Sequence, residues 1–222
     1  MERKIYVLTE KAIKDFKASN HQQANVITFS GSGEPTLALN LGEVIKEIKK
    51  ITNIPVTILT NGTLFNEKSV REDVLEADVI SVKLDAPDDK TLQAINRPHD
   101  GINLELILSG IKNLKNDISF VGARRDVPLL QIQIMFMPQN KNKINELAKL
   151  ICEIKPDEVV LNTPTRPYPS DFDIITRGAH GDDANKIKYP TKPLKQLTRE
   201  EAIEIENNLK TLTGLNVLSV YN

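Results

Sequence analysis

Polar residues and glycines follow several short apolar runs of this 222-residue chain. These polar and glycine residues are the ones that could bind a ligand or take part in catalysis. The first group, residues 30–34, reads Ser-Gly-Ser-Gly-Glu and follows the run Val-Ile-Thr-Phe. The candidate ligand-binding residues are Ser30, Gly31, Ser32, Gly33, Glu34, Thr60, Asn61, Lys83, Asp85, Asn162 and Thr163. If the runs are parallel strands, the residues that follow them share one edge of the sheet, where such folds bind ligands.

The residue types favour a zwitterionic or nucleoside ligand. Glu34 and the carbonyls of the glycine loop can accept hydrogen bonds from an ammonium group, and Asp85 can bind ribose hydroxyls. Neutral donors and acceptors come from Thr60, Asn61, Asn162 and Thr163. Each charged residue also has a simpler explanation. Glu34 could stabilise a helix N-terminus, Asp85 could bond its own turn, and Lys83 could be solvated.

Several common sites do not fit this sequence. The glycine loop lacks the third glycine of a dinucleotide fingerprint, and no Gly-Lys-Ser/Thr of a P-loop follows it. Ser30 and Ser32 lie outside a nucleophile-elbow pattern. The net charge of −1 gives no general attraction to nucleic acid or to an anionic membrane.

The cysteine count restricts metal chemistry. Cys152 is the one cysteine of the sequence, and His21, His99 and His180 share no metal-ligand spacing. A single cysteine excludes internal disulfides and suits a reducing cytoplasm, which is the compartment we expect. It also excludes a cluster or zinc site built from several cysteines of this chain, so we expect no metal site made by its own residues.

The elements that must position these residues alternate along the chain. Apolar runs predict strands at residues 26–29, 55–59, 79–84, 129–137, 158–161 and 215–220. Apolar residues at helical spacing predict helices at residues 41–51, 104–114, 144–154 and 202–212. This alternation indicates a parallel sheet with right-handed crossovers. Five strong strands favour an open or partial barrel over a closed eight-fold one.

Local signals add further expectations. Helix starts are predicted at Thr9, at Ser69 with Glu72, at Asp88 or Asp89, and at Thr198 with Glu201. Residues 1–8 alternate in polarity and could form an edge strand or a lead-in to the first helix. Residues 118–126 are polar and predict a loop. Residues 168–194 lack helical period and are rich in proline, glycine and aspartate, which predicts a long excursion.

Five segments on successive strand ends resemble the radical S-adenosylmethionine superfamily. They are residues 28–37, 59–64, 84–86, 95–99 and 161–167, and the first is similar to the Gly-Gly-Glu-Pro motif of that superfamily. The nearest branch comprises iron-sulfur oxidoreductase-like proteins similar to the wyosine-base-forming synthases of tRNA. The resemblance implies a partial (β/α)6 barrel, α/β in class, with a barrel core at residues 1–165. Residues 166–222 would then form the C-terminal excursion with the terminal helix and strand.

The resemblance also implies a cofactor, S-adenosylmethionine. In the superfamily, the loop matching residues 31–35 binds the methionine amino group. The strand end matching residues 82–85 lies near the ribose, and the strand matching residues 159–163 flanks the adenine. A [4Fe-4S] cluster reduces the sulfonium and releases a 5′-deoxyadenosyl radical.

The sequence departs from the superfamily at the cluster. The Cys-x3-Cys-x2-Cys loop lies upstream of the segment matching residues 2–11, so we expect an N-terminally truncated barrel. The cluster is expected only in a complete form, and this chain should be inactive as given. The alternatives are a non-catalytic nucleoside-binding module and an unrelated barrel enzyme that acts on sugar phosphates. A tRNA partner follows from the resemblance but not from the net charge, and an exposed sheet edge would favour a dimer.

Overall fold

The computed structural model describes residues 2–30, 33–122, 127–162, 168–169, 191–192 and 196–219. Six strands form one parallel sheet in the order β1-β2-β3-β4-β5-β8. Their bounds are β1 Ile27–Phe29, β2 Val56–Thr60, β3 Val79–Lys83, β4 Leu129–Met135, β5 Glu158–Asn162 and β8 Val217–Ser219. The sheet is not closed, which confirms the predicted partial barrel. A second pair, β6 Tyr168–Pro169 and β7 Thr191–Lys192, is antiparallel.

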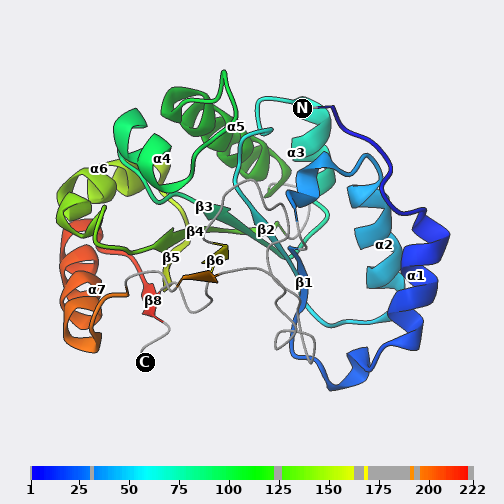
Figure 1. The fold of residues 1–222 in the computed structure, drawn as a ribbon. Coiled ribbons are helices and arrows are strands. Elements are labelled where there is room, and N and C mark those ends of the chain that lie inside the picture. Colours follow the sequence, from blue (N-terminus) through cyan, green and yellow to red (C-terminus); the bar gives the residue numbers. More distant parts are fainter. Residues whose placement is uncertain are drawn as a thin grey trace.

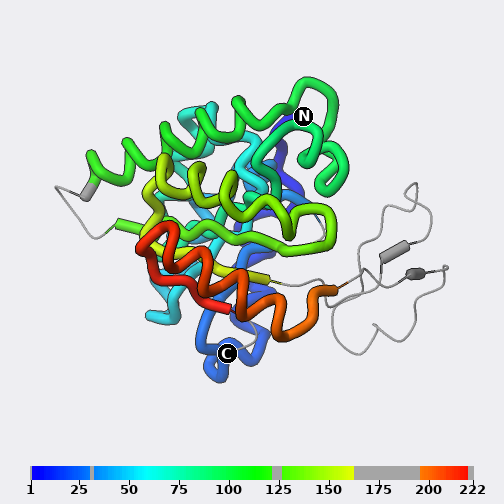
Figure 2. The backbone as a smooth tube through the Cα atoms, turned by 90° about the vertical axis from the view of Figure 1, so that its left-hand side faces the viewer, coloured from blue at the N-terminus to red at the C-terminus, as the bar shows by residue number. Residues whose placement is uncertain are grey.

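The helices lie in an arc along one face of the sheet (Figure 1). They are α1 Thr9–Ala18, α2 Leu41–Ile51, α3 Lys68–Val74, α4 Asp89–Ile95, α5 Leu104–Gly122, α6 Ile144–Ile154 and α7 Arg199–Thr213. Short 3₁₀ helices span His21–Gln23, Pro35–Leu37 and Lys141–Lys143. In Figure 2, α5, α6 and α7 follow one another around the sheet. No described helix is long and apolar enough to cross a membrane.

The core lies between this arc of helices and the sheet. On each long strand, alternate side chains face the helices, as the period of two requires. Ile58, Ile80 and Ile132 are fully buried in this layer. The terminal elements belong to the same core, because Leu209 of α7 and Val217 of β8 are buried in it. α7 and β8 therefore continue the main core and the main sheet.

Four local predictions differ from the structure. Residues 2–8 form no strand and make a single bridge, Lys4 with Ala38. Thr9 does not cap α1, whose N-cap is Leu8, and Ser69 lies inside α3 instead of capping it. Residues 118–122 continue α5 instead of forming a loop, because Ile118 is a buried core contact that extends the helical stripe. Residues 123–126 lie outside the described residues.

Two predicted helix starts are confirmed. The Asp88 side chain accepts a hydrogen bond from the Thr91 N–H at 2.8 Å and caps α4. Thr198 and Glu201 form a reciprocal capping box at α7. Both caps depend on residues three apart in sequence, which is why the sequence predicts them.

Candidate functional site

Glu34 joins the ends of β1 and β2. It precedes the 3₁₀ helix Pro35–Leu37 and caps it, because its Oε1 accepts hydrogen bonds from the N–H and the hydroxyl of Thr36 at 3.2 and 2.7 Å. The same oxygen accepts from the Thr60 hydroxyl at 2.6 Å, and Oε2 accepts from the Asn61 N–H at 2.8 Å. The carboxylate therefore fixes the loop after β1 to the end of β2.

This arrangement leaves part of the carboxylate available to a ligand. A carboxylate has about four acceptor positions, two on each oxygen. Oε2 uses one of its positions for Asn61, and the residue is half-buried, not enclosed. Glu34 thus has the helix-capping role that we gave as its simpler explanation, and it also keeps an acceptor position at the strand ends.

Thr60 and Asn61 mainly hold the Glu34 side chain in position through hydrogen bonds. Thr60 is buried, and its hydroxyl donates to Glu34 and accepts from the Gly62 N–H at 3.1 Å. Asn61 Oδ1 accepts from the N–H and the hydroxyl of Thr63 at 3.0 and 2.7 Å. The Asn61 amide NH₂ makes no side-chain hydrogen bond among the described residues.

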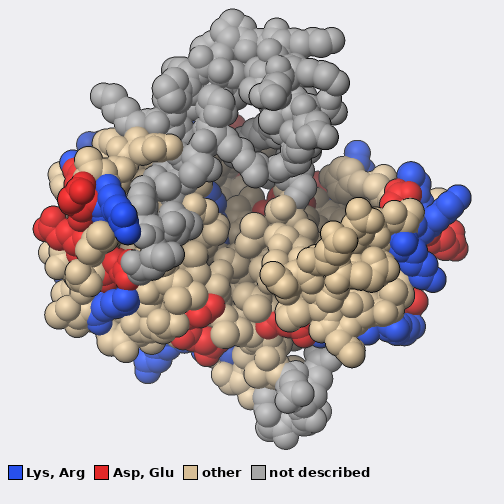
Figure 3. All heavy atoms as spheres, turned by 90° about the horizontal axis from the view of Figure 1, so that it is seen from below, with Lys and Arg blue, Asp and Glu red and all other residues tan. Residues whose placement is uncertain are grey.

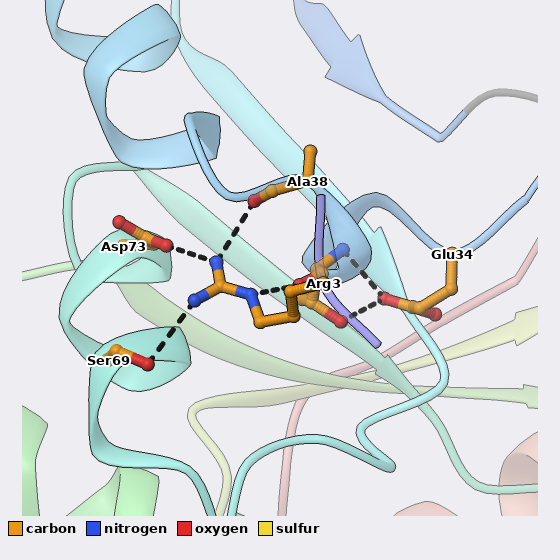
Figure 4. A network of polar contacts seen from close by, with 6 residues as sticks. Arg3, Glu34, Ala38, Ser69 and Asp73 are labelled. Atoms are coloured by element: carbon orange, nitrogen blue, oxygen red, sulfur yellow. Dashed lines mark hydrogen bonds and ion pairs between the residues drawn. The ribbon is translucent and has the colours of Figure 1, made fainter. Parts of the chain in front are cut away.

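Arg3 anchors the other side of this loop, and the sequence analysis missed it. Figure 4 shows its guanidinium between the loop and α3. It donates to the carbonyls of Thr36 and Ala38 at 3.0 and 2.9 Å, to the Ser69 hydroxyl at 3.2 Å, and to the Asp73 carboxylate. Only 8% of the Arg3 side chain is exposed. Thr36 therefore connects Arg3 to Glu34, and α3 holds the loop in place.

Asp85 occupies the centre of the β3–β4 strand ends and faces away from solvent. Its side chain is fully buried. Oδ1 accepts from the Met135 N–H at 2.8 Å, while Oδ2 accepts from the Asn96 amide at 2.8 Å and from the Lys83 ammonium. Its backbone carbonyl accepts from the Asn140 amide at 2.8 Å. Asp85 therefore holds four segments together, and its carboxylate is not presented to a ribose in this conformation.

Lys83 is the charged group that reaches the surface at this position. About a third of its side chain is exposed, against none of the Asp85 side chain. Because Asp85 fixes the ammonium group, the strand ends present an oriented cation there. Asn96 next to it has a buried side-chain oxygen that finds no hydrogen-bond partner among the described residues.

Those of the remaining predicted residues that the structure describes lie at the same edge of the sheet. Asn162 ends β5 beside Met135 of β4, and its carbonyl accepts from the Phe136 N–H at 3.1 Å. Ser30 follows β1 and is half-buried, and Gly33 is exposed, with open space where a Cβ would be. Gly31, Ser32 and Thr163 lie outside the described residues. We refer to the strand ends that carry Ser30, Glu34, Lys83 and Asn162 as the rim.

A pocket of about 240 Å³ opens beside Glu34. It is lined by Glu34, Leu37, Thr63, Leu64, Asn66, Glu67, Ile102 and Leu106. Pockets for drug-sized ligands are usually about 300–1,000 Å³. The pocket shares only Glu34 with the predicted site, so it can take a small group of a ligand but not a whole nucleoside.

Cys152 does not lie at the rim. It is exposed on α6, and its thiol lies 3.8 Å from the Leu212 carbonyl. Among the described residues, no three His, Cys, Asp or Glu side chains are grouped to hold a metal ion. With one cysteine in the whole sequence, the chain cannot ligate a cluster that needs three or four thiolates.

Residues 1–151 match the model of the Radical SAM superfamily. The chain belongs to that superfamily, as the resemblance of its strand-end motifs predicted. It is 39% identical to a UPF0026 protein of Synechocystis sp. over 214 residues, which are 96% of this chain and 76% of that relative. It is 31% identical to a UPF0026 protein of Methanocaldococcus jannaschii over 165 residues, which are 71% of this chain and 49% of the relative.

Solved structures show the same fold at low sequence identity. Streptococcus suis SuiB bound to S-adenosylmethionine matches with a TM-score of 0.63 at 16% identity, over 96% of this chain and 42% of SuiB. Archaeal TYW1 matches with a TM-score of 0.55 at 16% identity, over 92% of this chain and 58% of that protein. This chain therefore spans about half the length of these structures.

Proposed function

We propose that this chain is the S-adenosylmethionine-binding core of a radical S-adenosylmethionine enzyme of the iron-sulfur oxidoreductase-like type. The observation that carries the proposal is the Glu34 carboxylate, which is fixed by Thr36, Thr60 and Asn61 and keeps one acceptor position at the rim. An acceptor of this kind suits the ammonium group of an amino-acid ligand. Superfamily membership supports the choice of that ligand.

Three of the described rim residues, Glu34, Lys83 and Asn162, have a role in this proposal. Glu34 binds the methionine ammonium, and the exposed Gly33 lets the ligand approach the backbone. Lys83, oriented by Asp85, supplies the cation for the methionine carboxylate. Asn162 lies beside the adenine. S-adenosylmethionine would supply a 5′-deoxyadenosyl radical for hydrogen abstraction only after one-electron reduction of its sulfonium, which releases methionine and requires the cluster of a complete form.

The iron-sulfur cluster does not fit the residues of this chain. A complete form that cleaves S-adenosylmethionine needs thiolates that these 222 residues do not contain. We therefore assign no reaction step to the cluster here. The same observation favours a second candidate function, a non-catalytic module that binds nucleosides at the rim.

Titration calorimetry with S-adenosylmethionine and S-adenosylhomocysteine tests the proposal. We expect both to bind, with dissociation constants within about tenfold of each other, a gap of about 1.4 kcal/mol. Glu34→Gln should weaken S-adenosylmethionine binding by at least tenfold, because a charged hydrogen bond is worth about 1.5–3 kcal/mol. Glu10→Gln, at an exposed position of α1, is the matched control and should bind as the parent does.

Two results would contradict the proposal. The first is no binding of either adenosyl compound at millimolar concentration by a chain that melts cooperatively. The second is binding that Glu34→Gln leaves unchanged. Thermal melts of each variant separate a lost contact from a lost fold. Adenosine binding without any preference for the amino-acid portion would favour the nucleoside-binding module.

A further inference from the structure

The sheet face opposite the helices carries a row of polar side chains. Along β3, β4 and β5, the positions that alternate with Ile80, Ile132 and Val159 carry both apolar and polar residues; the apolar ones include Val79, Leu129, Met135 and Val160, and the polar ones include Ser81, Lys83, Gln131, Gln133 and Glu158. The period of two places them together on this face. In parallel barrels, the corresponding positions are usually filled with branched apolar residues. Their polarity here is therefore unusual for a position that serves packing alone.

Three of these side chains are joined across three strands. Ser81 is in register with Gln131, and Gln131 with Glu158. The Ser81 hydroxyl donates to Gln131 Oε1 at 2.6 Å, and Gln131 Nε2 donates to Glu158 Oε1 at 2.7 Å. We call Ser81, Gln131 and Glu158 the polar row. Because each member orients the next, the row fixes the Glu158 carboxylate on this face.

Two polar groups at or beside the polar row, a Glu158 oxygen and the Gln133 amide, lack hydrogen-bond partners among the described residues. Glu158 Oε2 has no hydrogen-bond partner among the described residues, and no described cation pairs with Glu158. The half-buried Gln133, two residues further along β4, makes no side-chain hydrogen bond within the described part of the chain. Beside Gln133, Lys83 pairs with Asp85 and not with Glu158. The negative charge of Glu158 is therefore the uncompensated charge of this set.

The position of the polar row limits the shape of a ligand that reaches it. In Figure 3, which views the molecule from below, Lys and Arg side chains gather on the two lobes, and Asp and Glu side chains also lie between them. Glu158 lies four residues before Asn162 on β5, which is about 13 Å at ~3.3 Å per residue. A ligand that contacts both the rim and the polar row must therefore be elongated.

We propose that the polar row, together with Gln133, binds a positively charged nitrogen of the substrate, such as an amine or a guanidine. The Glu158 carboxylate accepts from that nitrogen, and the Gln133 amide contacts the adjacent part of the same molecule. The inference rests on the proposed function, because it takes the rim as the place of reaction. It adds a substrate class: an elongated molecule with a cationic end about 13 Å from the rim.

NMR titration of the whole chain with agmatine, a guanidine-bearing amine, tests this inference, and valerate is the anionic control. We expect agmatine to shift the side-chain amide signals of Gln131 and Gln133 and to saturate at millimolar concentration, whereas valerate shifts neither. Glu158→Gln keeps an acceptor for Gln131 and removes the charge, so it should weaken agmatine binding at least tenfold. The control Glu153→Gln changes an exposed carboxylate on α6, in the helix layer, and should have no effect.

A second variant keeps the test valid if Glu158→Gln unfolds. Gln133→Met preserves the length of the side chain and removes its amide, and we expect agmatine to bind about threefold more weakly. Equal binding of valerate and agmatine, or agmatine binding that neither variant weakens, overturns the inference. S-adenosylhomocysteine, titrated into the same samples, separates the two proposals. If it binds and agmatine does not, only this inference fails; if agmatine binds through Glu158 and no adenosyl compound binds, the proposed function fails.

Discussion

The two carboxylates that matter most at the rim have opposite exposure. Asp85 is fully buried and uses both oxygens within the chain, whereas Glu34 is half-buried and keeps an acceptor position. In the sequence, Asp85 and Glu34 look equivalent, since each is an acidic residue that follows an apolar strand. At this scale, burial decides which carboxylate can meet a ligand: Glu34 accepts more internal hydrogen bonds than the Asp85 carboxylate but stays half-buried, whereas the Asp85 side chain is fully buried.

Replacement of Arg3 should cost stability at the Glu34 loop. Arg3→Ala removes hydrogen bonds to two carbonyls and leaves the Asp73 carboxylate, 23% exposed, without its cation. We expect the free energy of unfolding to fall by about 2–4 kcal/mol, measured by urea denaturation. Lys11→Ala breaks an exposed helix pair and should cost under about 0.5 kcal/mol. A loss for Arg3→Ala as small as that of Lys11→Ala would show that the network does not stabilise the fold.

The cap of α4 should make stability depend on acid pH. The backbone N–H of Thr91 is the largest cause that lowers the pKa of Asp88 below its ordinary value of 3.8. A carboxylate whose pKa is lower in the folded chain stabilises the fold above pH 3.8, and this contribution is lost as the pH falls through the folded pKa. Asp88→Ala should cost about 1 kcal/mol at pH 7, measured by urea denaturation.

Asp88→Asn separates the charge from the cap, because asparagine also caps helices well. The stability difference between the parent chain and Asp88→Asn should be present at pH 7 and should shrink at pH 3. A difference that is the same at both pH values would mean that the charge of Asp88 contributes nothing.

At the scale of elements, α6 and α7 end in the same way with different residues. Lys155 follows α6 with φ 53°, and Gly214 follows α7 with φ 68°. A left-handed conformation costs about 1–2 kcal/mol for a residue with a Cβ and nothing comparable for glycine. The two positions are therefore a matched pair in which opposite substitutions should have opposite effects.

Lys155→Gly should raise the free energy of unfolding by about 0.5 kcal/mol, because the added freedom of glycine in the unfolded chain offsets part of the relief. Gly214→Ala should lower it by about 1 kcal/mol, although open space surrounds the position of the new Cβ. Calorimetric melting temperatures of both variants measure these shifts. Changes of the same sign would show that side-chain contacts outweigh the backbone conformation.

At the scale of the whole molecule, β1 is an edge strand, and the residue directly before it is apolar and exposed. It is three residues long and pairs only with β2 in the described sheet. Val26, directly before it, is 47% exposed, and residues 5–8 are each 45–62% exposed. Unpaired edges and apolar surface both favour association.

We therefore predict that the chain self-associates through β1, as measured by sedimentation at increasing concentration. Val26→Lys should weaken the association at least tenfold. Leu218→Lys is the matched control, because Leu218 is similarly exposed at 45% on β8, the opposite edge strand. A chain that stays monomeric over the whole concentration range, or one that only Leu218→Lys disrupts, would contradict the prediction.

The sequence by itself determined the order of strands and helices, the parallel sheet, the position of Glu34 and the caps at Asp88 and Thr198. These features depend on the spacing of apolar residues and on pairs of residues a few positions apart. Both kinds of pattern can be recognised in the sequence alone. The tertiary structure decided the rest. Arg3 contacts Asp73 across 70 positions, Asn140 contacts Asp85 across 55, and the polar row spans three strands. Such hydrogen bonds exist only after folding brings distant segments together, so no local pattern marks the residues that make them.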